Sequence, residues 1–483
     1  MNDKEIGNRG NKGVLAAALI TAFMTTFMGS AVFLSIPSLE VYFGVSAATV
    51  NWIVSGYTLT VAACSLPFGK IADATGRRCV FLIGSAGFFI LSAVSIFSVN
   101  VMMLIIARTL QGAFGAMVFS TNNAILISTY HHSVQGKMLG YSVAATYIGL
   151  TAGPVIGGVL NANFGWKSIF AVSFLISAVA FIVSIIYMPD DRVGKIENIS
   201  SDGIVSDADL PTNAVSKKSR FDLKGGMLYL IWIAMTLYGL TNLTVSKSSL
   251  SIFIAGVVMA VLFFYMESRT ENPVMDVGIF AKSKVFTFSN FAALFNYCAT
   301  FAVSYMGSIY LQIVKGLPSD QAGLILIVMP AMQALFSPYM GSLSDKSRPS
   351  VIASCGMAVC CVMLVMFSRL EQNSSIAYII MILCLNGIGF AMFSSPNNNV
   401  IMKCVSSSEY GVANSIITTM RTYGQSLGMA VLNIVTGLIL GKGSLEAASA
   451  DNLILLNRVA FTAFAVLCAI GVVFSAVRVE KKK

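Results

Sequence analysis

Two arginines stand alone within long apolar stretches of this 483-residue chain, and they are its first candidates for chemistry. A guanidinium carries a permanent charge and five N–H donors, which suits it to bind a carboxylate or a phosphate. A charge placed in lipid costs about 2.5–3.5 kcal/mol on insertion scales, so such residues are functional candidates by default. We therefore expect Arg108 and Arg421 to bind a solute that is anionic, or neutral with an acidic group.

Polar side chains accompany each arginine at helical spacing. Asn414, Thr418, Arg421 and Gln425 recur at i, i+4, i+7 and i+11, which places them on one helix face. Aromatic rings with a few amides suit a mostly apolar ligand, although each residue alone can equally serve helix–helix bonding. The predicted substrate-binding residues are Arg108, Gln111, Asn122, Tyr147, Asn290, Asn296, Tyr297, Asn397, Asn398, Arg421 and Gln425.

Other kinds of chemistry find no support. The two histidines, His131 and His132, are adjacent and no CxxC pair occurs, so no metal site is expected. Gly424 to Gly428 fits GxSxG, but this hydrolase motif needs a strand-to-helix turn and a histidine partner. No GxxxxGK[ST] loop occurs. We expect no enzyme, no catalytic residue and no cofactor, with a proton or ion gradient as the energy source.

The composition says which elements carry these residues. Hydrophobic residues make up 56% of the chain and charged residues 11%, whereas soluble domains carry about 25% charged residues. This excludes a soluble enzyme and a nucleic-acid binder, and it predicts an all-α polytopic membrane protein. Apolar runs of about 20 residues, the length of a membrane-crossing helix, predict 14 transmembrane spans. They begin near residues 14, 48, 79, 101, 137, 166, 225, 249, 285, 319, 350, 375, 411 and 456.

The distribution of Lys and Arg fixes the orientation. With the N-terminus in the cytoplasm, 23 of the 31 fall in inside segments, six fall outside, and Arg108 and Arg421 remain within spans. Such a bias follows the positive-inside rule. We expect a monomer in a prokaryotic cytoplasmic (plasma) membrane, with both termini cytoplasmic and with lipid and a small-molecule substrate as its partners.

The two halves of the chain resemble each other. Residues 120–127 read STNNAILI and residues 395–402 read SPNNNVIM, an offset of 275 that also relates Gly149 to Gly424 and Gly153 to Gly428. This repeat predicts two six-helix bundles, with two extra helices after a polar linker. The predicted division is a cytoplasmic tail (1–13), an N-terminal bundle (14–189), a cytoplasmic linker (190–224), the extra helices (225–268), a C-terminal bundle (285–476) and a basic cytoplasmic tail (477–483).

Three further motifs lie in the predicted N-terminal bundle, and the first has a degenerate copy in the C-terminal bundle. Residues 69–78 read GKIADATGRR, in which an aspartate can cap a helix or pair with arginine across a domain seam and so latch one conformation. The predicted latch residues are Gly69, Asp73, Gly76, Arg77, Arg78 and, in a degenerate second copy, Asp345. Residues 107–112 read ARTLQG, and residues 149–158 read GLTAGPVIGG. The predicted helix-packing residues are Gly149, Gly153, Pro154, Gly157, Gly158, Gly424 and Gly428.

These motifs resemble GxxxDxxGR[RK], RxxQG and GxxxGPxxGG of the major facilitator superfamily, and 14 spans resemble its drug:proton antiporter branch. The resemblance implies two bundles around a cavity that opens alternately to either side, with spans 1, 2, 4 and 5 facing spans 9, 10, 12 and 13. It implies efflux of a small amphipathic solute by antiport and multidrug resistance. That branch usually has an acidic residue in span 1, where Met28 stands here. The alternative is therefore an organic-anion transporter, by uptake, exchange or uniport, without a membrane carboxylate for proton coupling.

Overall fold

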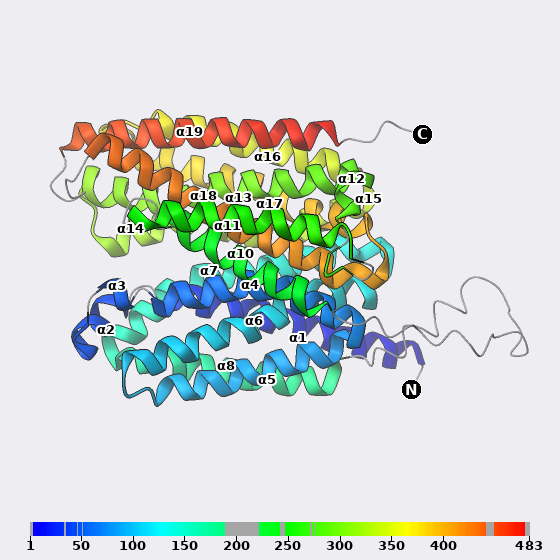
Figure 1. The fold of residues 1–483 in the computed structure, drawn as a ribbon. Coiled ribbons are helices and arrows are strands. Elements are labelled where there is room, and N and C mark those ends of the chain that lie inside the picture. The colour runs from blue at the N-terminus through cyan, green and yellow to red at the C-terminus, as the bar shows by residue number, and fades with distance from the viewer. Residues whose placement is uncertain are drawn as a thin grey trace, which may run out of the picture.

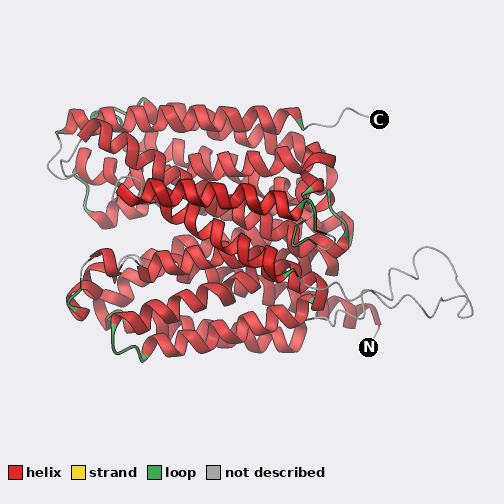
Figure 2. Ribbon diagram, in the orientation of Figure 1, coloured by secondary structure: helices red, strands yellow, loops and turns green. Residues whose placement is uncertain are grey.

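The computed structural model describes residues 3–32, 35–45, 47–50, 52–188, 222–241, 247–270, 273–275, 277–440 and 449–478. Within these ranges the chain consists of helices joined by short loops, without a strand (Figure 2). The long helices run side by side, and both termini lie at one end of the molecule (Figure 1). This confirms the predicted all-α membrane fold.

Six long helices and two short ones form the N-terminal half. They are α1 (Asp3–Ala31), α2 (Ile36–Phe43), α3 (Ala47–Val50), α4 (Trp52–Thr75), α5 (Arg77–Ile96), α6 (Val101–Thr129), α7 (Gln135–Phe164) and α8 (Lys167–Tyr187). Residues in the turns between these helices end one helix and begin the next. Gly76 separates α4 from α5 with φ +118°, and the Asn100 side chain caps α6 by accepting from the Met103 N–H.

The C-terminal half repeats this arrangement. Its helices are α12 (Gly278–Lys282), α13 (Lys284–Ile309), α14 (Ser319–Leu326), α15 (Val328–Lys346), α16 (Pro349–Ser368), α17 (Ile376–Lys403), α18 (Tyr410–Leu440) and α19 (Ala450–Val477). A π-helical turn at Tyr310–Val314 extends α13. The order of the long helices matches that of the first half.

Between the halves in the sequence come α10 (Leu223–Thr241) and α11 (Lys247–Glu267), which pack on each other. The α10 helix also contacts α4 and α18, so it covers the line where these two helices meet. The Tyr229 hydroxyl lies 2.7 Å from the Thr419 Oγ1 of α18, and the Trp52 ring of α4 stacks on Tyr238 at 5.7 Å. The extra pair is therefore attached to both halves.

Among the described residues, 13 helices are long and apolar enough to cross a membrane. The seventh predicted span, which begins near residue 225, corresponds to α10, a shorter apolar helix whose apolar part is Lys224–Leu240. The count of 14 spans thus stays a prediction. The predicted cytoplasmic tail at 1–13 is continuous with the first span, because α1 already begins at Asp3. Residues 190–221 of the predicted linker and 479–483 of the basic tail lie outside the described residues.

Small residues let neighbouring helices of each half approach closely. A Cβ at Gly153 would come within 2.0 Å of the Ser30 Oγ, and one at Gly157 within 2.3 Å of the Ala31 carbonyl oxygen. In the second half, a Cβ at Gly424 would meet the Leu294 carbonyl oxygen at 2.5 Å. In lipid, where apolar burial does not drive association, such backbone contact is a main source of helix affinity. The α1–α7 and α13–α18 pairs are therefore equivalent.

Candidate functional site

The two halves meet at one end of the molecule through a carboxylate on α4. Asp73 accepts the backbone N–H groups of Gly411 and Val412 at 3.1 and 3.0 Å, at the N-terminus of α18. Its Oδ1 also lies 2.9 Å from the Arg77 Nη2. A helix N-terminus carries partial positive charge and unpaired N–H groups, so the carboxylate satisfies both. Arg77 further donates to the Ser407 carbonyl oxygen, which adds a second bond across the seam.

The same device occurs a second time with the halves exchanged. Asp345, at the end of α15, accepts from the Gly136 and Lys137 N–H groups at 2.8 and 3.0 Å, at the N-terminus of α7. The Asn399 Nδ2 also approaches its Oδ1 at 3.4 Å. We call the contacts of Asp73 and Asp345 with these helix termini the two latches.

Close backbone contact accompanies each latch. A Cβ at Gly69 would come within 2.6 Å of the Gly411 carbonyl oxygen, and one at Gly341 within 2.1 Å of the Gly136 carbonyl oxygen. Real Cβ atoms essentially never approach that closely, so these positions admit glycine alone in this conformation. Of the other predicted latch residues, Gly76 forms the α4–α5 turn with φ +118°, and Arg78 lies in the first turn of α5.

Between the halves, farther along the seam, lies a small cavity of about 40 Å³. Its walls come from α1, α6 and α7 on one side and α13, α17 and α18 on the other. The lining residues are Ala22, Phe119, Asn122, Asn123, Ser142, Val143, Thr146, Tyr147, Tyr297, Ser394, Asn398, Asn414, Ile417, Thr418 and Arg421. Ligand pockets typically measure about 300–1,000 Å³. The cavity must therefore widen before it can hold a drug-sized solute.

Arg421 is the charged residue of this lining. Its guanidinium lies over the Phe119 ring at 5.0 Å, a cation–π contact that spans the two halves. Among the described residues, no carboxylate stands within ion-pair distance of it. About two helical turns before Arg421, Asn123 donates to the Asn414 Oδ1 at 2.8 Å, and Asn414 donates to the Phe119 carbonyl oxygen. The cavity floor is thus a polar bridge between α6 and α18.

Aromatic rings form another part of the lining. Tyr147 of α7 and Tyr297 of α13 both pack edge-on against Phe390, with centroids at 5.1 and 5.6 Å. The Tyr297 hydroxyl lies 3.4 Å from the Ser394 Oγ. This wall presents ring edges and hydroxyls, so it can pack on a flat aromatic solute and bond to its polar substituents.

Five predicted substrate-binding residues line the cavity: Asn122, Tyr147, Tyr297, Asn398 and Arg421. Arg108 does not. It is fully buried inside the N-terminal half, where it donates to the carbonyl oxygens of Ile53 and Met28 and to the Gln111 Oε1. Its guanidinium also lies 4.3 Å from the Tyr57 ring centroid. Every direction of this side chain is occupied by protein.

The remaining predicted residues lie away from the cavity as well. Asn290 donates to the Phe286 carbonyl oxygen of its own helix, and Asn296 is buried within the C-terminal half. Asn397 accepts from Arg478, which is 2% exposed and also donates to Ser289 and Ser475. Burial lowers the pKa of Arg478 to about 10, so it stays charged at neutral pH. Gln425 lies one turn beyond Arg421 and is not part of the lining.

Several lining residues had no place among the predicted binding residues. Asn123, Ser142, Thr146 and Ser394 line the cavity, as do Asn414 and Thr418, which the polar stripe on α18 had marked. Asn123 stands in the repeated segment STNNAILI, and this repeat was the available signal. The hydroxyl residues carry no such signal, because serine and threonine in membrane helices usually bond to their own backbone. Among the described residues no cluster of His, Cys, Asp or Glu fits a metal ion.

Comparison with known proteins relates the chain to membrane transporters. The family model described as Major Facilitator Superfamily matches residues 18–429 and 290–483. The chain is 29% identical over 422 residues to the riboflavin transporter RibZ of Clostridioides difficile, covering 86% of each chain. It is 27% identical over 440 residues to the multidrug resistance protein Stp of Mycobacterium tuberculosis, covering 89% of this chain and 76% of that one.

The fold is also similar to a solved structure. The human organic anion transporter MFSD10 superimposes with a TM-score of 0.65 at 13% identity, covering 96% of this chain and 99% of that one. At this identity the likeness concerns the fold alone.

Proposed function

The chain belongs to the major facilitator superfamily and is a membrane transporter rather than an enzyme; from this premise we propose that it is a secondary active transporter of small amphipathic solutes that carry an acidic group. It works by alternating access across the cytoplasmic membrane. The central cavity is the solute site, and the two latches close one of its two entrances.

The observation that carries this proposal is the isolated charge of Arg421. The described lining contains no carboxylate, so the cavity presents one positive charge, amides, hydroxyls and aromatic edges. An anionic group of the solute would neutralise Arg421 in a site screened from water, where charge-assisted hydrogen bonds are strongest. Its ring system would pack between Tyr147 and Tyr297. The chain's similarity to RibZ, a riboflavin transporter, supports a flat aromatic solute, because riboflavin has a flat aromatic ring system.

Export by antiport is the second part of the proposal. It is supported by the GxxxGPxxGG motif of α7, whose glycines pack on α1, and by the efflux-type names of relatives such as the tetracenomycin C export protein of Streptomyces glaucescens. In the described spans, the carboxylates lie at helix ends rather than at mid-depth, so a carboxylate beside the solute is not the proton carrier.

The test uses purified protein in liposomes and two dyes of one ring system, anionic fluorescein and cationic rhodamine 6G. We expect fluorescein to bind at least tenfold more tightly. Arg421→Ala should abolish this preference, since a charge-assisted hydrogen bond contributes about 1.5–3 kcal/mol. Lys403→Gln, which removes a charge at the exposed end of α17, is the matched control. Equal binding of both dyes, or unchanged fluorescein transport by Arg421→Ala, would refute the assignment.

A further inference from the structure

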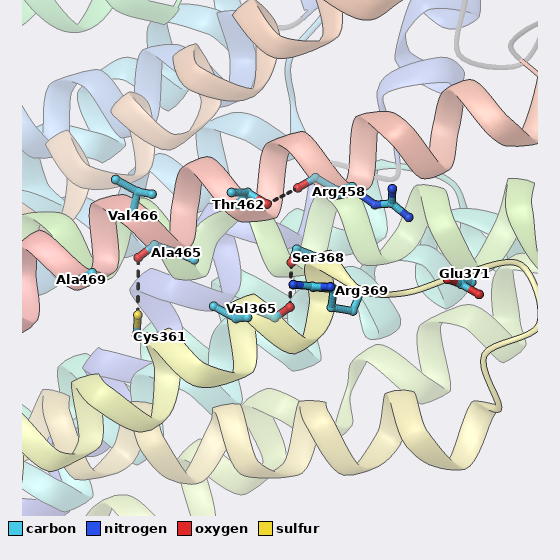
Figure 3. Close-up of a pocket in the computed structure, with 10 residues that line it drawn as sticks. All are labelled: Cys361, Val365, Ser368, Arg369, Glu371, Arg458, Thr462, Ala465, Val466 and Ala469. Carbon is cyan, nitrogen blue, oxygen red and sulfur yellow. Dashed lines mark hydrogen bonds between the residues drawn. The ribbon is translucent and has the colours of Figure 1, made fainter.

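A second and larger hollow lies on the outside of the C-terminal half. It is a groove of about 840 Å³ between α16 and α19, and it shares no residue with the central cavity (Figure 3). Small and branched apolar side chains form one part of it, at the left in Figure 3: Val365 from α16 and Ala465, Val466 and Ala469 from α19. The Cys361 thiol, 3.5 Å from the Ala465 carbonyl oxygen, joins the two helices at its floor.

The walls of this groove face lipid. Val466 is 56% exposed and Val365 is 44% exposed, although both belong to helices that are apolar enough to span the membrane. Side chains of this kind stay exposed on a membrane protein because acyl chains cover them. The apolar part of the groove is therefore open to the hydrocarbon region.

The other part of the groove, at the right in Figure 3, carries charge. Arg369 follows the last residue of α16, and Arg458 stands in α19 on the opposite wall, with Glu371 nearby in the connecting segment (Figure 3). Both arginines are exposed, and neither forms an ion pair within the part of the chain that is described. The three charged residues leave the groove with one net positive charge.

Helix lengths place these charges at the membrane surface. The 20 residues of α16 extend about 30 Å, which equals the hydrocarbon thickness, so Arg369 follows at its boundary. The 28 residues of α19 extend about 42 Å, which exceeds that thickness by about 12 Å. Arg458 lies about 12 Å from the start of α19 and reaches the same level. This end is opposite the latches, since Arg478 at the other end of α19 bonds to Asn397 beside the Asp345 latch.

We propose that this groove binds a phospholipid with an anionic head group, taken from the leaflet at the end opposite the latches. Arg369 and Arg458 hold the phosphate from two sides, because a guanidinium offers paired N–H donors to phosphate oxygens. One acyl chain lies along Val365, Ala465 and Ala469, where the alanines leave room for it. The single net charge of the groove matches a head group with one negative charge better than a zwitterionic one.

Native mass spectrometry of the full chain tests this. The protein is reconstituted in liposomes of equal phosphatidylglycerol and phosphatidylcholine, extracted in mild detergent, and its retained lipids are identified. We expect retention of phosphatidylglycerol, reduced at least tenfold in the double variant Arg369→Gln/Arg458→Gln. Lys167→Gln removes an exposed charge at the same end of the other half and should retain the lipid.

Ala469→Phe fills the groove while leaving both arginines, and it should also release the lipid. Because Ala469→Phe keeps Arg369 and Arg458, it tests lipid binding in the groove even if the double variant folds poorly. Phosphatidylglycerol retained by either variant at the level of the unmodified protein would overturn the proposal, as would equal retention of the two lipids. The amount of retained lipid does not depend on dye transport through the central cavity. The lipid proposal and the proposed function can therefore be refuted independently.

Discussion

Replacing Asp73 by asparagine tests whether the first latch holds the halves together. The side chain keeps its shape but loses its charge. Its one remaining oxygen can accept from only one of the Gly411 and Val412 N–H groups, because the NH2 group that replaces the other oxygen is a donor. The ion pair with Arg77 is lost as well. The variant should therefore favour the conformation in which this end is open.

The magnitude follows from the contacts. One charge-assisted hydrogen bond, about 1.5–3 kcal/mol, disappears, and the other becomes a neutral bond of about 0.5–1.5 kcal/mol. Loss of the anion at a helix N-terminus adds about 0.3–1 kcal/mol. Water solvates the aspartate in the open state and offsets part of this, so about 2–3 kcal/mol remains. The open-to-closed ratio at this end should rise roughly 30- to 150-fold.

Two native cysteines suit the measurement. Cys79 and Cys355 are exposed and lie near the latch-end starts of α5 and α16, one in each half. With the other cysteines replaced, spin labels on this pair report the distance between halves by pulsed electron resonance. The asparagine variant should shift the distribution towards longer distances, whereas Glu409→Gln, which changes a half-buried carboxylate on the same seam that bonds locally to Ser406, should not.

An unchanged distance distribution in Asp73→Asn would refute the latch, provided the protein keeps its melting temperature. So would an equal shift in Glu409→Gln, because the effect would then come from general charge and not from the helix terminus.

Three further substitutions separate packing from solute binding. Gly69→Val should prevent closure at the latch end, since its Cβ would meet the Gly411 carbonyl oxygen at 2.6 Å; the same spin labels should report longer distances and transport should fall at least tenfold. Gly149→Leu should lower the melting temperature by forcing α1 from α7, where a Cβ would meet Thr26 Oγ1 at 2.3 Å, while Gly437→Leu, with nothing within 4 Å, should leave it unchanged. Arg108→Lys should cost about 2–4 kcal/mol of stability by losing its fork of hydrogen bonds, with dye affinity unaltered; weaker dye binding at an unchanged melting temperature would instead make Arg108 part of the site.

The sequence predicted the family, the helical membrane fold and the segments that carry the latches. Apolar runs and glycine motifs are local signals, and each lies within one or two helices. The partner of a carboxylate is different, because it depends on which helix end lies opposite. The motif at 69–78 indicated a cap or an ion pair for Asp73, but only the packed structure identifies the α18 terminus as the partner.

Depth explains why Arg108 was grouped with the binding residues. Arg108 and Asn122 share a face of α6, yet 14 residues separate them, which is about 21 Å along the helix axis. Periodicity reports the face of a helix and not the depth, so residues of one stripe reach different layers of the bundle. Asn122 reaches the cavity, while Arg108 reaches the carbonyl oxygens of α1 and α4.

The cavity and the second latch are joined by one short piece of α17. Its three consecutive asparagines point in different directions, because successive helical residues are rotated by about 100°. Asn397 is held by Arg478, Asn398 lines the cavity, and Asn399 bonds to Ser344 and approaches Asp345. A rotation of this segment that improves contact between Asn398 and a solute must also move Asn399 away from its partners. For the proposed transporter we therefore expect solute binding and release of the second latch to occur as one movement of α17.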